Sequence, residues 1–301
     1  MADPVSRRGD PFADWPRPLA FVLSGGGAYG ATQVGMLGAL AEAGVVPDLV
    51  VGASVGALNG VVVAAHADDA ADRLADVWRR IDRRTIFGGG AVRAMATLVR
   101  TRASLCRPDL LAGLIGEHID HETFEGLPVP FAAVATDLFT GEPELLSTGA
   151  IGPALLASAA IPGVFPRVEI GGRHYVDGGV SANVPIRQAI TFGAASALVL
   201  DANPAHTADR PPQGLVPSLV HTVSVMLRSQ RAHAVDELAH RYRVVGLPQV
   251  TPADMSSFDF RRSTELIDAA HRHTAAFLAS WSESDPGPPG VDQDHRPRRI
   301  D

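Results

Sequence analysis

Short apolar runs alternate along this chain with longer segments whose apolar residues recur every three or four positions. Residues 19–23 (LAFVL) form such a run, and residues 30–43 follow with Val34, Leu37 and Leu40 at helical spacing. The first pattern is typical of a buried strand and the second of a helix packed on one face. Repeated strand–helix alternation predicts an α/β fold, in which helices on both faces of a mostly parallel central sheet make a three-layer α/β/α arrangement. The same patterns predict strands at residues 49–51, 131–135, 173–176 and 197–200, and helices at residues 55–65, 70–81, 216–238 and 263–278.

One domain accounts for most of the chain, because no Gly/Ser linker or shift of composition divides its 301 residues. We expect that domain to span residues 18–282, after a flexible leader at residues 1–17 and before a disordered, proline-rich tail at residues 283–301. The leader lacks the apolar core of a signal peptide, and glycines or prolines interrupt the two long uncharged runs, residues 49–65 and 145–166. The sequence therefore predicts no transmembrane helix and a cytoplasmic protein.

Composition argues against several classes of protein. Arg and Lys total 26 against 33 for Asp and Glu, a net charge of −7, which disfavours nucleic-acid binding because that affinity comes from neutralising phosphates. Cys106 is the one cysteine, so the chain can form no internal disulfide and no cysteine-rich metal site, and we expect a packing role for it. The chain has no lysine, which excludes a Schiff-base or P-loop lysine. We expect neither a cofactor nor a metal.

A glycine-rich segment, SGGGAYG at residues 24–30, lies between the first strand and the first helix. It fits the pattern G-x-G-x-x-G, which alone is compatible with a dinucleotide site, an anion-binding loop or a simple tight turn. A dinucleotide site also needs an acidic residue at the end of the second strand, to hold the ribose. Here that strand runs into Gly52, Ala53 and Ser54, and Asp48 precedes it, which disfavours the dinucleotide interpretation.

A second glycine-flanked turn, GASVG, follows the second strand directly. The pattern G-x-S-x-G between a strand and a helix is typical of a nucleophile elbow, in which small flanking residues let the strand and helix pack closely. We therefore expect Ser54 to be a nucleophile. Because the two glycine-rich strand ends are expected to be neighbours, backbone N–H groups can form an oxyanion hole beside it, from Gly25, Gly26 and Gly27.

The base that would activate Ser54 is harder to find than the nucleophile. Most of the eleven histidines lie on expected helices among polar residues, where a solvated surface position is the commoner role. His174 is the exception, since it stands three residues before Asp177 in residues 171–179, which predict a hairpin or short strand ending in Asp-Gly-Gly. A lone Asp-Gly-Gly is most often a turn. However, the preceding SAAIPGVFP, residues 158–166, is unusually small and apolar, as the wall of an acyl-binding site would be.

Taken in order, these motifs resemble those of the patatin-like phospholipases. GGGAYG resembles the family's glycine-rich oxyanion loop, GASVG its nucleophile elbow and DGG its catalytic aspartate motif. ATDLFTGE at residues 135–142, SAAIPGVFP at 158–166 and VDGGVSANVPI at 176–186 are similar too, as is the ending at 256–278. The resemblance covers residues 18–278.

The resemblance implies a Ser–Asp dyad, with Ser54 as nucleophile and Asp177 as base, and neither a catalytic histidine nor a metal. A carboxylate is a weak base for an alcohol, but burial raises its basicity, while oxyanion amides and a helix dipole stabilise the developing charge. The implied activity is hydrolysis of carboxylic esters of phospholipids or lysophospholipids through an acyl-enzyme. The glycines that support the motifs are Gly30, Gly52, Gly56, Gly178 and Gly179.

Two other functions stay open: a soluble esterase or thioesterase for small acyl substrates, which needs the same dyad, and a catalytically inactive lipid-binding regulator. Two positions also depart from the family's usual pattern. Ser24 stands where many members have Asp or Gly, and Tyr29 stands where most have Arg or Lys. The second departure removes a positive charge near the oxyanion loop and leaves its backbone donors intact.

A segment after three glycines at residues 88–90 bears on access to the site. In residues 91–107, Val92, Met95 and Val99 recur at helical spacing. This is typical of an ordinary core-facing helix, and it is also compatible with a glycine-hinged lid that touches anionic lipid. The partners we expect are therefore a lipid or acyl-ester substrate and, peripherally, a membrane surface; the sequence does not indicate an oligomeric state.

Overall fold

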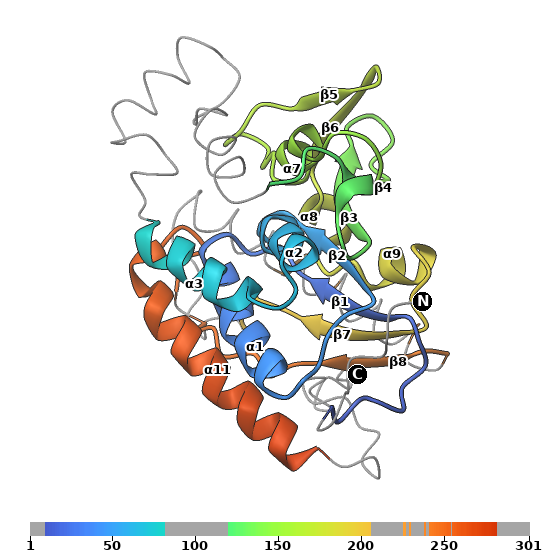
Figure 1. Ribbon diagram of the computed structural model, residues 1–301. Helices are drawn as coiled ribbons and strands as arrows, with labels where there is room; N and C mark the ends of the chain where they lie inside the picture. The colour runs from blue at the N-terminus through green and yellow to red at the C-terminus, as the bar shows by residue number, and fades with distance from the viewer. Residues whose placement is uncertain are drawn as a thin grey trace, which may run out of the picture.

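The computed structural model describes residues 10–81, 120–205, 225–226, 229, 238, 241–253 and 255–281. Its strands form one sheet in the order β5-β6-β3-β2-β1-β7-β8, with β4 also paired to β3 (Figure 1). Strands β1, β2, β3, β7 and β8 are parallel, and β4, β5 and β6 are antiparallel additions. This confirms the mostly parallel sheet expected from the sequence. The strands are β1 Leu19–Leu23, β2 Leu49–Ala53, β3 Phe131–Asp137, β4 Pro143–Leu146, β5 Val168–Ile170, β6 Arg173–Asp177, β7 Ser196–Leu200 and β8 Arg243–Gly246.

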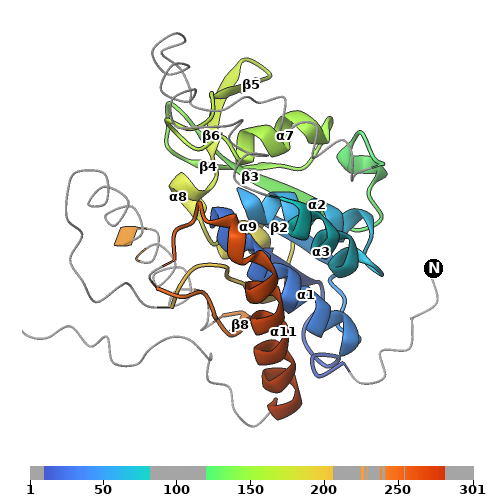
Figure 2. The same ribbon diagram turned by 90° about the vertical axis from the view of Figure 1, so that its left-hand side faces the viewer.

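Helices cover both faces of the sheet, so the three-layer arrangement is confirmed. They are α1 Ala31–Glu42, α2 Val55–Ala65, α3 Ala70–Arg80, α7 Ile151–Ser158, α8 Gly179–Ala182, α9 Ile186–Thr191 and α11 Ser263–Ser280, with single 3₁₀ turns at η1 Gly27–Gly30, η2 Phe124–Gly126 and η3 Phe260–Arg262. Successive strand residues point to opposite faces. Phe21 and Val50 pack with α1, α2, α3, α7 and α11, whereas their neighbours Val22 and Val51 pack with α8 and α9. Figure 2 shows the first of these helical layers, with α1 and α11 side by side.

The registers bring two strand ends to the same level of the sheet. Ala53, the last residue of β2, lies beside Val134 of β3. Asp177, the last residue of β6, lies beside Ala135 of β3. Although β6 runs antiparallel to β3, it pairs only with the last three residues of that strand, so the end of β6 meets the end of β2. The residue that follows β2 is therefore brought close to the residue that ends β6.

The packed unit begins before residue 18, which corrects the expectation of a flexible leader over residues 1–17. Residues 1–9 lie outside the described part of the chain. Phe12 is fully buried and Trp15 nearly so, and their rings lie 5.1 and 6.0 Å from that of Trp281, just after α11. The segment is mostly polar and contains prolines, which led to the expectation of flexibility. The burial of its two aromatic residues instead holds it on the domain.

Three expected features lie outside the described residues: the segment 91–107 with Cys106, most of the helix at 216–238, and the tail at 283–301. None of the described helices combines the length and the hydropathy that crossing a membrane requires.

Candidate active site

Ser54 occupies the sharp turn between β2 and α2. Its backbone has φ 54° and ψ −126°, and it is the one non-glycine residue with positive φ in the described part of the chain. This rarely adopted conformation is the geometry of a nucleophile elbow. Gly52 and Gly56 permit the turn, because a Cβ on Gly52 would overlap the backbone of Gly56, and a Cβ on Gly56 would overlap the carbonyl oxygen of Leu23. A larger residue at either position would push the strand and the helix apart.

Asp177, at the end of β6, is the hydrogen-bond partner of the Ser54 side chain. Ser54 Oγ donates to Asp177 Oδ2 at 2.6 Å, and both residues are buried. The second carboxylate oxygen, Oδ1, accepts the backbone N–H of Gly179 at 2.7 Å, at the start of α8. Gly178 lies against β3, where a Cβ would overlap the carbonyl oxygen of Val134. The structure thus brings together the two side chains to which the resemblance assigns the chemistry.

The environment of Asp177 changes its acidity. Burial raises the pKa of Asp177 to about 6, and the hydrogen bonds from Ser54 and Gly179 oppose that rise. A carboxyl group with a pKa near 6 is ionised at neutral pH and is a stronger base than an ordinary aspartate. The pair therefore joins a hydroxyl donor to a carboxylate suited to accept its proton.

The glycine-rich loop lies directly beside Ser54, since a Cβ built on Gly25 would be 3.2 Å from Ser54 Cβ. Gly25 donates its N–H to the carbonyl oxygen of Asn183 at 2.9 Å. Within the described residues, the N–H groups of Gly26 and Gly27 have no acceptor. The N–H of Gly25, one of the three donors expected from the sequence, is therefore already bonded to Asn183, and the oxyanion hole itself stays a prediction.

Two further glycines shape this loop. Gly27 has φ +57°, and a Cβ there would lie 2.5 Å from the carbonyl oxygen of Ser257. A Cβ on Gly30 would lie 2.6 Å from Val55 Cγ2, in the first residue of α2. The glycine loop therefore packs closely on the backbone of Ser257 at one point and on the side chain of Val55 at another.

The same motifs, in the same order, match a known protein family. The family model for patatin-like phospholipases matches residues 21–190, more than half of the chain. This chain belongs to the patatin-like phospholipase family.

Relatives in the patatin-like phospholipase family are mostly longer than the matched region. Rv1063c of Mycobacterium tuberculosis, named an uncharacterized NTE family protein, is 32% identical over 168 residues, or 56% of this chain and 44% of that protein. Patatin-like phospholipase domain-containing protein 7 of Rattus norvegicus is 29% identical over 193 residues, or 61% of this chain and 13% of that protein. The match thus spans less than half the length of these curated relatives. VipD from Legionella pneumophila, a solved structure, covers 88% of this chain and 67% of its own, with 15% identity and a TM-score of 0.46.

Tyr29 replaces the Arg or Lys that is usual in patatin-like proteins. Its hydroxyl donates to the carbonyl oxygen of Met255 at 2.5 Å, and burial raises the pKa of Tyr29 to about 12, so the side chain is neutral. The preceding residue, Ala28, donates its N–H to the carbonyl oxygen of Ser257 at 2.7 Å. In this chain a neutral side chain stands in place of a cation, and its hydrogen bond links the glycine loop to residues 255–257.

Ser24, the other departure from the patatin-like pattern, is fully buried beneath the loop. Its hydroxyl accepts the N–H of Ala202 at 2.9 Å and donates to the carbonyl oxygen of Gly25 at 3.0 Å. Asn203 Nδ2 donates to the same carbonyl at 2.9 Å. These bonds tie the loop to the carboxyl end of β7. The sequence analysis did not single out Asn203, whose one signal is a polar residue three positions after the buried parallel strand β7.

His174, the histidine nearest Asp177 in sequence, is not brought to Ser54. Its Nδ1 lies 3.9 Å from Glu169 Oε2, and its ring lies 5.8 Å from that of Phe139. These contacts are all on the outer, antiparallel part of the sheet. In the described part of the chain, no group of three His, Cys, Asp or Glu residues is arranged to hold a metal ion.

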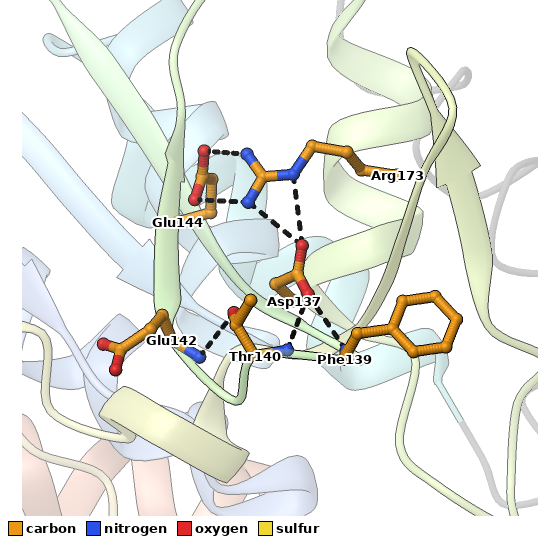
Figure 3. Close-up of polar contacts among 6 residues, drawn as sticks. All are labelled: Asp137, Phe139, Thr140, Glu142, Glu144 and Arg173. Carbon is orange, nitrogen blue, oxygen red and sulfur yellow. Dashed lines mark hydrogen bonds and ion pairs between the residues drawn. The ribbon is translucent and has the colours of Figure 1, made fainter.

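A polar cluster fixes the β3–β4 turn, near the strand that carries Asp177 (Figure 3). Asp137 accepts the N–H groups of Phe139 and Thr140 at 2.9 and 3.0 Å, and pairs with Arg173 at 3.0 Å. Arg173 also pairs with Glu144. The two N–H groups and Arg173 hold the pKa of Asp137 below its ordinary value. The Phe139 ring points away from this cluster and is exposed.

Proposed function

We propose that the protein is a serine acyl hydrolase that cleaves carboxylic esters of lipids through an acyl-enzyme on Ser54. The observation that carries the proposal is the 2.6 Å hydrogen bond from Ser54 Oγ, at a positive-φ turn, to the buried carboxylate of Asp177. Membership of the patatin-like phospholipase family supports lipid acyl hydrolysis as the general activity. The Ser54–Asp177 pair supplies the nucleophile and base that such a reaction needs.

In the proposed reaction, Asp177 takes the hydroxyl proton as Ser54 Oγ attacks the ester carbonyl carbon. The carbonyl oxygen takes up the displaced electron pair, and the N–H groups of Gly26 and Gly27 and the N-terminus of α2 stabilise the resulting oxyanion. Collapse re-forms the carbonyl and breaks the ester C–O bond, and the leaving alkoxide takes the proton from Asp177. Water then attacks the acyl group, giving a proton to Asp177, and a second collapse releases the carboxylic acid and returns the proton to Ser54.

The proposed substrates are phospholipid or lysophospholipid acyl chains. Two small apolar residues, Ala159 and Ala160, are buried beside Asp177. The backbone N–H of Asp177 donates to the carbonyl oxygen of Ala160 at 3.0 Å. Such a wall suits a hydrocarbon chain better than a charged group. A soluble esterase or thioesterase would use the same Ser–Asp pair. A rate that rises when a substrate passes from monomers to micelles favours the lipid hydrolase, and an unchanged rate favours the small-substrate enzyme.

Mutation of the pair tests the chemistry. We expect Ser54→Ala and Asp177→Asn each to lower turnover of a short-chain ester by about a thousandfold or more, because each removes one of two interdependent groups. Thermal unfolding and circular dichroism check that both variants are folded. Turnover near that of the wild type in either folded variant contradicts the proposed dyad, and turnover of no acyl ester by the wild type favours a lipid-binding regulator.

We also propose that the protein meets a membrane surface through its β3–β4 turn. The side chains of Leu138, Phe139 and Val180 are 42%, 79% and 48% exposed. The hydroxyls of Thr136 and Ser181 lie 2.8 Å apart, which joins the end of β3, next to Leu138 and Phe139, to α8, which carries Val180. Asp137 and Glu144 pair with Arg173 at the base of the turn, and the carboxylate of Glu142 is exposed, so we propose that only the apolar tip enters the lipid interface while these charged groups stay in water.

Vesicle binding tests this surface separately from the chemistry. We expect Phe139→Ser to weaken binding to phospholipid vesicles about tenfold, because one large apolar side chain no longer leaves water. Hydrolysis of a monomeric ester is expected to be unchanged. Met226→Ser is the matched control, since Met226 is another exposed side chain, at 58%. Equal vesicle binding by the two variants contradicts the proposed surface.

A further inference from the structure

Ser158, the last residue of α7, is a fully buried polar residue in an otherwise apolar stretch. A buried hydroxyl requires hydrogen-bond partners. Its Oγ accepts the backbone N–H of Ser54 at 3.0 Å and donates to the carbonyl oxygen of Val134 at 2.6 Å. One side chain on α7 therefore joins the turn that holds the nucleophile to strand β3, which lies between β2 and β6.

The backbone of the same segment holds the other half of the pair. The carbonyl oxygen of Ser158 accepts the N–H of Gly178 at 3.0 Å, and that of Ala160 accepts the N–H of Asp177 at 3.0 Å. The side-chain bond from Ser54 to Asp177 then closes a ring of hydrogen bonds. The end of α7 is thus bonded to both members of the pair, and it sets the distance between them.

Ser54 needs such support because its backbone is strained. Its φ of 54° and ψ of −126° form a conformation that persists only where the surroundings fix it. The bond to Ser158 Oγ is the hydrogen bond of the Ser54 N–H. Without it, a buried donor and the carbonyl of Val134 would both lose a partner, and the elbow could relax toward a commoner conformation.

We propose that Ser158 is a positioning residue, whose buried hydroxyl holds Ser54 Oγ at the distance from the Asp177 carboxylate that proton transfer requires. Ser158 makes no contact with the reacting atoms in this scheme and acts through the backbone of Ser54. Small displacements of a nucleophile lower the rate of the chemical step more than they lower substrate binding. The inference rests on the proposed function, in which Ser54 is the nucleophile.

Ser158→Ala tests the inference, with Ser196→Ala as its matched control. Ser196 is also fully buried, and its hydroxyl also donates 2.6 Å to a backbone carbonyl, that of Pro16, but it lies at the opposite end of the parallel strands from Ser54. On a monomeric ester we expect Ser158→Ala to lower kcat about 10- to 100-fold, with KM changed less than about twofold. The rate of inactivation by a fluorophosphonate falls in parallel. Ser196→Ala is expected to keep both rates while losing similar thermal stability.

Two more variants separate positioning from folding. Ser158→Thr keeps a hydroxyl and is expected to restore most of kcat. Ser158→Cys leaves no cavity, since the thiol is somewhat larger than the hydroxyl, but it hydrogen-bonds weakly, so it replaces the Ala variant if that variant does not fold, and we expect the same loss. A Ser158→Ala or Ser158→Cys variant whose kcat equals that of Ser196→Ala overturns the positioning role. If Ser54→Ala is itself active, the proposed function fails instead, so the two failures are distinguishable.

Discussion

The elbow around Ser54 and the β3–β4 turn beside Arg173 are fixed in different ways. At the elbow, backbone touches backbone, and a Cβ on Gly52 or Gly56 would overlap main-chain atoms. At the turn, ion pairs hold the chain, and the space around Gly141 is open, although its φ of +75° still favours glycine. The proposed chemistry is thus placed where the backbone permits one arrangement, and the proposed membrane contact where the surface leaves room for change.

This difference has an energetic side. Overlapping atoms in a close-packed interior force the backbone to move, and the cost is large. Arg173, which pairs with the buried Asp137 and with Glu144, is itself half-exposed, so water screens its ion pairs and they contribute little to stability. We therefore expect substitutions at the elbow to lower the stability of the fold much more than substitutions at the turn.

Gly56→Ala has the largest expected effect. Its Cβ would overlap the carbonyl oxygen of Leu23, so we expect a loss of about 3 kcal/mol or more in the free energy of unfolding, measured by urea denaturation. Gly152→Ala is the control, because Gly152 lies in α7 with nothing within 4 Å of its Cβ. Equal stability of the two variants would contradict the claim that close backbone packing constrains the elbow.

Asp177→Asn is expected to stabilise the fold at pH 8 while abolishing activity. The pKa of Asp177 is raised from 3.8 to about 6, so its ionised form costs the folded state about 3 kcal/mol above pH 6. That cost disappears as the pH falls through 6 toward 4, because the folded state binds the proton first. We therefore expect the variant to be about 1–3 kcal/mol more stable than the wild type at pH 8, and the difference to vanish near pH 4. A variant that is less stable at pH 8 contradicts the buried-carboxylate account.

The same pKa predicts the pH dependence of turnover. Asp177 must be ionised to accept a proton, so the rate on a neutral ester is expected to rise from pH 5 to pH 7 with an apparent pKa near 6. The profile of kcat/KM measures this value in the free enzyme. A profile that is flat over this range excludes Asp177 as the group that titrates.

Arg173→Gln has the smallest expected effect. Arg173 is half-exposed, and Asp137 keeps its two backbone N–H partners when the guanidinium is lost. We expect the thermal midpoint to fall by no more than a few degrees and turnover of a monomeric ester to stay unchanged. A loss of stability comparable to that of Gly56→Ala would show that the turn is as constrained as the elbow.

Much of the parallel sheet could be predicted from the sequence, because its strands are continuous apolar runs. The run at residues 19–23 matches β1, and the helix expected at residues 55–65 matches α2. Strands β4 and β5 gave no such signal, since both are short and largely half-buried and so lack a continuous apolar pattern. Of the antiparallel strands, β6 was expected at residues 173–176, whereas β4 and β5 came only from the structure.

That Ser54 and Asp177 lie together could also be expected from the sequence, but the hydrogen bonds around them could not. Ser54 and Asp177 stand in motifs whose order identifies them, whereas the loss of Gly25 as a donor depends on the carbonyl of Asn183. That carbonyl is a backbone group, so its position cannot be predicted from the type of residue. The hydroxyl of Ser158 had one signal, a lone polar residue in an apolar run, and what it contacts depends on the end of α7 meeting β2 and β3.

Labelling by a fluorophosphonate tests the central claim most directly, because the reagent bonds covalently to an activated serine. We expect one label per folded chain, mapped by peptide mass spectrometry to the peptide that contains Ser54. The label is expected to be absent in Ser54→Ala and after denaturation, and to form far more slowly in Asp177→Asn. A label on another residue, or labelling of Asp177→Asn at the wild-type rate, would contradict the assignment of Ser54 as a nucleophile activated by Asp177.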